Sequence, residues 1–192
     1  LLRIIGTSML PDKSVHKNVS ESIPALAKQG VYPREIYDNF NSQLDNITDL
    51  VMINEVLSLK SDTPLKSAVA GYKYGIPGGR IGLDSLAEYA ENPDIIPNIT
   101  YSRYWHGYVV VLKPLLMLFN YDQIRMVNTY VFYILLLLAV IVMYKRLDLR
   151  LPFALVFMLL MLNISVLTAV FQYTTVFILM LLAIIITLKI ND

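Results

Sequence analysis

V-N-T-Y-V-F-Y-I-L-L-L-L-A-V-I-V-M-Y, the eighteen residues from Val127 to Tyr144, decide what kind of protein this chain forms. The stretch contains no charged residue, and as a helix it would extend about 27 Å at 1.5 Å per residue. The hydrocarbon core of a bilayer is about 30 Å thick. We therefore expect Val127–Tyr144 to cross a membrane.

A second apolar stretch runs from Pro152 to Leu188 and holds 37 residues without a charge. As one helix it would measure about 55 Å, which is too long for a single crossing. We expect two spans, 152–171 and 173–188, with the turn near Gln172–Thr175. A break at Asn163–Ser165 is the alternative, but it leaves only eleven residues before it, so we expect those polar groups to face a neighbouring helix.

The charged residues are concentrated in the first two thirds of the chain. The 192 residues are 56% hydrophobic and 16% charged, whereas soluble domains carry about 25% charged residues. Of the 31 charged side chains (16 basic and 15 acidic), six lie beyond residue 126: Lys145, Arg146, Asp148, Arg150, Lys189 and Asp192. The chain thus joins a polar part to an apolar part.

We expect a mainly α-helical, polytopic membrane protein, and the start at Leu1 rather than Met predicts a fragment of a longer chain. Residues 11–106 would form a mostly helical loop domain. Residues 107–126 would form a juxtamembrane or re-entrant segment, because a lysine and a proline interrupt the apolar run there. Residues 1–10 are either the end of a truncated transmembrane helix or a buried start of the loop domain.

Three basic residues, Lys145, Arg146 and Arg150, follow the first span. Cytoplasmic loops carry an excess of Lys and Arg, so we expect residues 145–151 to be cytoplasmic in a cell membrane. The residues before about 126 are then extracytoplasmic. The net charge of +1 provides no basic surface for nucleic acid, so we expect no nucleic-acid partner. No cysteine is present, which excludes disulfides and thiolate chemistry.

Two helices of the polar part can be predicted. Ser22 is placed to cap a short helix that ends at Gly30. Apolar residues recur at helical spacing from Gln43 to Lys60, and Asp45 and Asp49 would be neighbours on one face of that helix. Like charges at this spacing are mildly unfavourable, which suggests an acidic site close to the membrane. The alternative is an ordinary solvated helix face.

Two further stretches contain groups that suit ligand binding. Gly75–Gly82 includes Arg80 and could offer backbone N–H groups and a guanidinium to a phosphate, although it lacks the Lys-Ser/Thr of a P-loop and also fits a flexible turn. Tyr101–Tyr108 contains Arg103, Tyr104, Trp105 and His106 directly before an apolar run. Such a stretch is typical of an aromatic belt at the membrane interface, where a site for a lipid-linked substrate would also lie.

This order of elements resembles glycosyltransferases of the GT-C type, which are multi-pass enzymes that use lipid-linked sugar donors. Their first large external loop carries an essential acidic residue, and a His-Pro-Pro-Leu-like motif leads into later spans. The comparable stretch here begins at His106 and continues to Lys113-Pro114-Leu115-Leu116, with the His and Pro separated. The chain is also similar to bacterial multi-pass membrane proteins with an Arg-Tyr-Trp-His-Gly stretch ahead of their spans.

The resemblance implies sugar transfer from a polyprenyl phosphate to a cell-envelope acceptor. Asp45 or Asp49 would be the general base or would hold a divalent cation, the one cofactor for which there is a candidate role. His106 would assist proton transfer. Phosphate charge and the sugar or prenyl chain would be bound by four residues: Arg80, Arg103, Tyr104 and Trp105. The partners would be membrane lipids and the polyprenyl-phosphate-linked sugar.

The alternative class is a non-enzymatic multi-pass protein, such as a transporter, a flippase subunit or an assembly scaffold. Transport pathways carry ionisable residues within their spans. Neither 127–144 nor 152–188 contains one. A third possibility is a binding module held at the membrane by its apolar helices.

Overall fold

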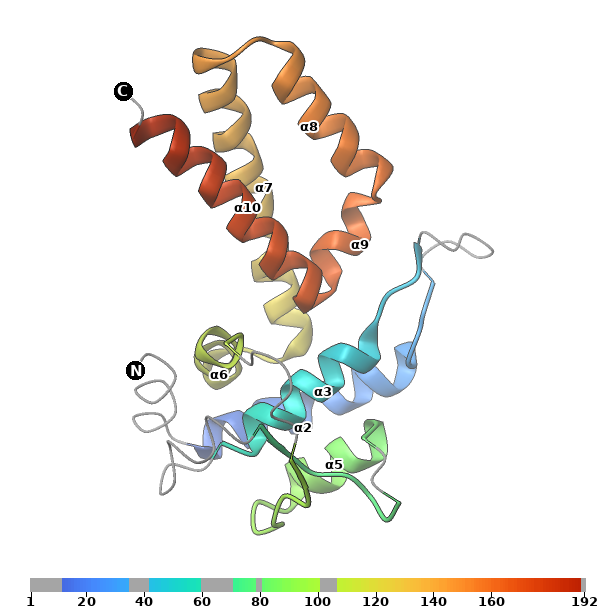
Figure 1. Cartoon of the computed structure of the whole chain (residues 1–192). Coiled ribbons are helices and arrows are strands. Elements are labelled where there is room, and N and C mark those ends of the chain that lie inside the picture. The colour runs from blue at the N-terminus through green and yellow to red at the C-terminus, as the bar shows by residue number, and fades with distance from the viewer. Residues whose placement is uncertain (1–11, 35–41, 60–70, 79–80, 101–106, 191–192) are drawn as a thin grey trace. The chain divides into compact units, whose positions relative to one another are not determined.

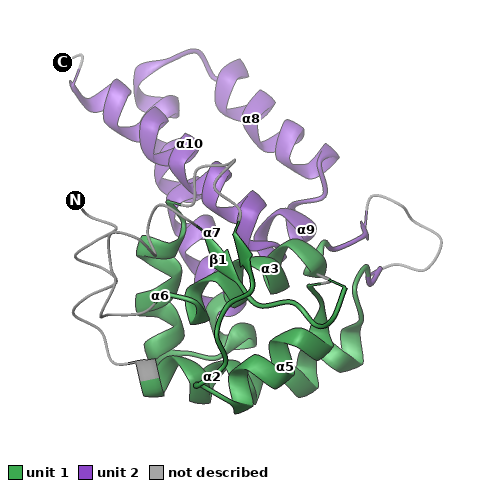
Figure 2. Ribbon diagram, turned by 60° about the horizontal axis from the view of Figure 1, so that its bottom comes forward, with its two compact units in different colours: residues 1–32, 45–124 green, residues 33–44, 125–192 purple. Residues whose placement is uncertain are grey.

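The computed structural model describes residues 12–34, 42–59, 71–78, 81–100 and 107–190. These residues form eight helices and one two-stranded antiparallel sheet (Figure 1). The predicted mainly helical class is therefore confirmed. The chain divides into unit 1, residues 1–32 and 45–124, and unit 2, residues 33–44 and 125–192 (Figure 2).

The described part of unit 1 contains four complete helices, namely α2 (Asp12–Gln29), α3 (Asn46–Leu57), α5 (Leu83–Glu91) and α6 (Val109–Leu118). Helix α2 packs against α5 and α6, and α3 packs against all three of these helices. The short strands β1 (Tyr72–Lys73) and β2 (Ile99–Thr100) pair antiparallel, with Tyr72 opposite Thr100, and β1 also packs on α3. Helix α3 is therefore the central element of unit 1.

Helix α2 begins at Asp12, well before Ser22, the residue expected to cap it. Ser22 does not cap it but lies in its interior, where the Ser22 hydroxyl donates to the carbonyl of Asn18 at 2.6 Å. Pro24, which removes one intrahelical hydrogen bond, is also inside the helix. Packing on α5 and α6 outweighs this local cost. The end of the helix is as predicted, since Gly30 has φ +77° and its N–H donates to the carbonyl of Leu26 at 2.9 Å.

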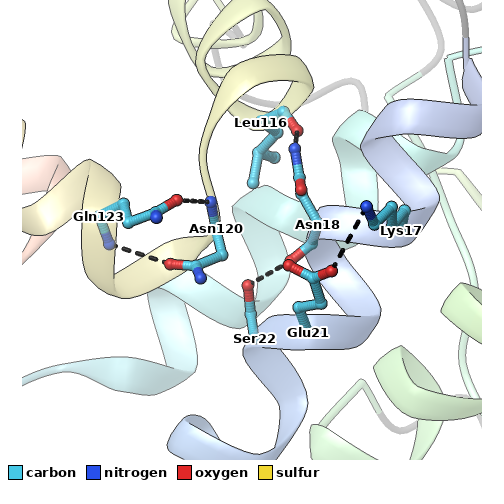
Figure 3. A network of polar contacts seen from close by, with 7 residues as sticks. All are labelled: Lys17, Asn18, Glu21, Ser22, Leu116, Asn120 and Gln123. Carbon is cyan, nitrogen blue, oxygen red and sulfur yellow. Dashed lines mark hydrogen bonds and ion pairs between the residues drawn. The ribbon is translucent and has the colours of Figure 1, made fainter.

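Side chains of α2 fix the ends of two later helices (Figure 3). Asn18 Nδ2 donates to the carbonyl of Leu116 at 2.8 Å, which satisfies a carbonyl in the last turn of α6. Ser22 Oγ accepts the N–H of Tyr121 at 2.9 Å, at the start of α7 (Tyr121–Arg146). The same start is closed by reciprocal 3.0 Å bonds between Asn120 and Gln123. The first turn of α7 is thereby bound to unit 1.

Unit 2 contains the rest of α7 together with α8 (Arg150–Met161), α9 (Ile164–Ala169) and α10 (Phe171–Ile190). Its core is an apolar cluster with members from all four helices: Phe132, Ala139, Met143, Leu155, Leu159, Leu167 and Leu181. Leu44, from the short segment 33–44, packs against Val166 and Val170.

Two helices are long and apolar enough to cross a membrane, α7 with 26 residues and α10 with 20. At 1.5 Å per residue they measure about 39 and about 30 Å. Only 17% and 11% of their most apolar windows are buried. A core helix of a soluble protein passes the same test of length and composition but is mostly buried, and these two helices are mostly exposed.

The uninterrupted helix expected over 152–171 is not formed. Helix α8 ends at Met161, and Asn163 adopts φ +58°, a left-handed conformation that Asn reaches more easily than most residues. Ser165 Oγ donates to Asn163 Oδ1 at 2.7 Å, a local bond that competes with helical structure. The chain breaks a second time at Val170, near the turn predicted at Gln172. The length of the uncharged stretch 152–188 predicts one break, whereas the structure has two.

Candidate functional site

Helix α3 carries an unusual number of buried polar side chains. Nine of its twelve residues are buried, and four of the nine are polar or charged: Asn46, Asp49, Asn54 and Glu55. A helix buried on all sides is normally apolar all round. Burying a polar or charged group is costly unless it is hydrogen-bonded or paired. Partners for each of the four come from other parts of unit 1.

Asp45 caps α3 and is not part of its face. Its two carboxylate oxygens accept from the N–H of Thr48 at 3.2 Å and from the Thr48 hydroxyl at 2.6 Å. This is the bonding of an N-cap residue, which satisfies an otherwise unpaired N–H of the first turn. The expectation that Asp45 and Asp49 are neighbours on one helix face is therefore wrong, because the helix begins at Asn46. The catalytic role of Asp45 stays a prediction.

Asp49 lies in the interior of unit 1 and is 0% exposed, so it does not belong to a solvated helix face. The hydroxyl of Tyr121 donates to Asp49 Oδ2 at 2.9 Å and lies 3.3 Å from Asn46 Oδ1. Asn46 Nδ2 in turn donates to the carbonyl of Gly30 at 2.8 Å. This chain of bonds joins the end of α2, the first turn of α3 and the first residue of α7.

A second buried group centres on Glu55. Its carboxylate lies 3.1 Å from Lys73 Nζ, and the two side chains are 0% and 3% exposed. The hydroxyl of Tyr108 donates to the same carboxylate at 2.8 Å. Sequence reasoning missed Glu55 and Lys73, and it included Tyr108 in the stretch Tyr101–Tyr108 without giving it a role. The available signal was an acid within the apolar run of α3, but no spacing rule connects it to a lysine 18 positions later.

Lys113 is the single charged residue of α6, and it is buried, with 1% of its surface exposed. Its Nζ lies 3.4 Å from the carbonyl of Leu59, to which it donates. The exposed positions of α6 are apolar, among them Val111 and Leu118. The helix therefore buries its one charge beside Val109, Leu112 and Leu116, and its exposed side chains are apolar as well.

The start of the glycine-rich stretch is held by two asparagines. The Asn54 amide exchanges two 2.8 Å hydrogen bonds with the backbone of Tyr74. The Asn98 amide does the same with Gly75, donating at 2.7 Å and accepting at 2.9 Å. The Gly75 N–H is therefore already bonded within the protein, which disfavours its use as a phosphate ligand. Arg80 lies outside the described residues.

Tyr74 also contacts α5. Its hydroxyl is hydrogen-bonded to Glu88, and this bond, with smaller effects of desolvation and of the Glu88 charge, raises the pKa of Tyr74 above its usual value. The ring of Tyr74 packs at 5.4 Å against that of Tyr89, which is fully buried. Strand β1 and its continuation are thus fixed on both α3 and α5.

The described part of the structure does not bring the predicted site residues together into one site. Asp45 and Asp49 have the separate partners given above. Four of the other five are consecutive, and all five lie outside the described residues: Arg80, Arg103, Tyr104, Trp105 and His106. Within the described ranges, no group of three or more His, Asp or Glu side chains could hold a metal ion. Comparison of the chain with protein families, with curated proteins and with solved structures finds no match.

The arrangement nevertheless concentrates ionisable groups in one small unit. Two carboxylates, two ammonium groups and one phenolic hydroxyl are buried around α3 and α6: Asp49, Glu55, Lys73, Lys113 and Tyr121. The half-buried Tyr108 contacts one of them, Glu55. Such groups can bind two elements together, or hold a charge where a membrane-bound substrate reacts.

Proposed function

We propose that the chain is part of an integral membrane glycosyltransferase-like protein, which transfers a sugar from a polyprenyl-phosphate-linked donor to a cell-envelope acceptor. The observation that supports a site at Asp49 is its hydrogen bond with Tyr121, the first residue of α7. A helix that crosses a bilayer has its ends near the two interfaces. Asp49 would therefore lie at the depth of the donor's phosphate and sugar.

In this proposal α7 and α10 cross the membrane, and α8 with α9 form a bent crossing between them. The loop 145–151, with Lys145, Arg146 and Arg150, faces the cytoplasm, as the excess of basic residues favours. The residues before about 126 are then extracytoplasmic, and Tyr121 lies at the outer interface.

The chemistry follows from the resemblance to GT-C enzymes. Asp49 takes the proton of an acceptor hydroxyl, whose oxygen attacks the anomeric carbon of the donor while the bond from that carbon to the phosphate oxygen breaks. Polyprenyl phosphate leaves with its negative charge stabilised by Arg103 and Arg80. Because Asp49 is fully buried, the Tyr121 hydrogen bond has to open before the acceptor can reach it.

Amide substitution tests the role of Asp49. Asp49→Asn retains an oxygen that accepts from Tyr121 but removes the carboxylate base, so the protein should accumulate normally while product formation falls by about 100-fold or more. Asp84→Asn, on the exposed surface of α5, is the matched control and should behave as wild type. The measurement is mass spectrometry of lipid-linked sugars and surface glycans in cells. Wild-type glycans with Asp49→Asn would remove Asp49 from the proposal.

The second candidate function is a non-enzymatic membrane component, such as a transporter, a flippase subunit or a scaffold. The complete burial of Asp49 and of the Glu55–Lys73 pair favours it, because groups withdrawn from solvent often hold elements together. Deletion of the gene separates the two candidates. Accumulated donor and lost product support the transferase, whereas unchanged glycans support the non-enzymatic component.

A further inference from the structure

Helix α6 of unit 1 is apolar on both its buried and its exposed side, and its single charged residue is buried. Val111 and Leu118 are 62% and 71% exposed, whereas the helix's one charged residue, Lys113, is 1% exposed. Among the described residues of α2, α3 and α5, no large apolar side chain is exposed. Among these four helices, an exposed apolar side is therefore a property of α6.

The orientation of α6 would be unfavourable in water. Water would favour Lys113 in solvent and the side chains of Val111 and Leu118 in the interior, because burying an apolar side chain is favourable and burying an ammonium is costly. Instead Lys113 donates to the carbonyl of Leu59, and Asn18 holds the last turn through the carbonyl of Leu116 (Figure 3). These contacts fix the helix with its apolar side outward.

The same orientation is favourable against lipid. Lysines within membrane-embedded segments face the protein and bond to charges or to backbone carbonyls, as Lys113 does. The chain also leads from α6 directly into a helix that is able to cross a membrane, since only Phe119 and Asn120 separate α6 from α7. The first turn of that helix belongs to unit 1.

The geometry points to a lipid-binding surface on unit 1: the outer side of α6, with Val111 and Leu118, lies in the acyl region at the membrane surface. Helix α6 is then an interfacial helix that anchors unit 1 to the bilayer, next to the start of α7. The inference rests on the membrane part of the proposed function and goes beyond it by naming the face of unit 1 that meets the lipid. The partner is the bilayer, and no particular headgroup is required.

Single cysteines provide the test, because the chain has none of its own. The full chain carrying Val111→Cys or Leu118→Cys is labelled with an environment-sensitive fluorophore and reconstituted in phosphatidylcholine vesicles. Lys17→Cys, at a side chain 75% exposed on α2, is the aqueous control, and Leu137→Cys on α7 is the membrane control. Each label is exposed to a lipid-borne nitroxide and to aqueous iodide.

We expect labels at 111 and 118 to lose most of their fluorescence to the nitroxide and to be quenched several-fold less by iodide than the label at 17. Iodide quenching equal to that at 17, with position 137 still in lipid, would overturn the inference and leave the membrane proposal intact. Protection from both quenchers would also overturn it, because protein would then cover α6. An aqueous label at 137 would contradict the membrane proposal itself.

Discussion

Unit 1 and unit 2 bury and expose opposite kinds of side chain. The four buried charged residues of the described chain are Asp49, Glu55, Lys73 and Lys113, and all of them belong to unit 1. Of the 28 large apolar residues that are exposed within the described ranges, 23 belong to unit 2 and five to unit 1. If both units were in the same solvent, we would expect them to expose similar kinds of side chain. The comparison shows that unit 1 buries charges held by hydrogen bonds and by the Glu55–Lys73 ion pair, and it supports our proposal that the exposed apolar helices of unit 2 lie in a membrane.

The largest expected effect on stability comes from breaking the buried ion pair of unit 1. Glu55→Ala leaves the Lys73 ammonium buried without its carboxylate, and should lower the free energy of unfolding by about 3–5 kcal/mol. Denaturant unfolding of the full chain in mild detergent measures it.

The exposed pair Lys17–Glu21 provides the matched control. Its charges are 3.8 Å apart with side chains 75% and 50% exposed, so Glu21→Ala should cost about 0–1 kcal/mol. Replacing both members of the buried pair by Met should recover much of the lost stability, because no buried charge then remains. Equal costs for Glu55→Ala and Glu21→Ala would show that the buried pair is not a fixed part of unit 1.

The next effect concerns the outward face of unit 2. Leu137 is 60% exposed on α7, and Leu137→Arg should reduce insertion of that helix by about 2.5–3.5 kcal/mol, the cost of a charged residue at the centre of a membrane helix. A glycosylation-reporter assay of helix insertion measures the change. Lys17→Glu, at a side chain 75% exposed on unit 1, should leave insertion unaltered. Normal insertion of the Leu137→Arg chain would indicate that this face of α7 is not in lipid.

The smallest effect is the alkaline titration of Tyr74 in unit 1. The hydrogen bond to Glu88 raises the pKa of Tyr74, so the fold favours the protonated phenol. Its contribution to stability is complete below about pH 10, the pKa of an unperturbed tyrosine, and is lost as the pH rises through the raised value. The difference in phenolate absorbance between wild type and Tyr74→Phe isolates this titration. Glu88→Gln should shift the pKa of Tyr74 back toward its ordinary value. A wild-type Tyr74 pKa at or below the ordinary value would exclude the contact between Tyr74 and Glu88.

The sequence predicts apolar segments well and their ends less well. The expected span 127–144 lies within α7, but the helix begins six residues earlier, at Tyr121, and continues to Arg146, because hydropathy detects the apolar part of a helix and not its polar ends. The span 173–188 lies within α10 in the same way. The break at Asn163 was rejected on length, although the local bonding of Asn and Ser is what decides it.

The polar contacts of unit 1 could not be predicted from the sequence. Asp49 and Tyr121 are 72 positions apart, and periodicity shows which face of a helix is apolar but not which distant group a buried carboxylate will meet. Ser22 was expected to cap its own helix and instead accepts from the first N–H of α7. Local rules identified polar residues that matter for the fold, but their partners depend on tertiary packing.

The central claim, that the two units fold in different media, is tested most directly by thiol accessibility along the cysteine-free chain. Single cysteines at exposed positions of both units react with a membrane-impermeant maleimide in permeabilised vesicles, with an SDS-treated sample as the total. We predict full reaction at Lys17 and Asp84 on unit 1 and almost none at Ile134 and Leu137 on α7. Equal reaction at all four positions would contradict the account, because the apolar face of unit 2 would then lie in water.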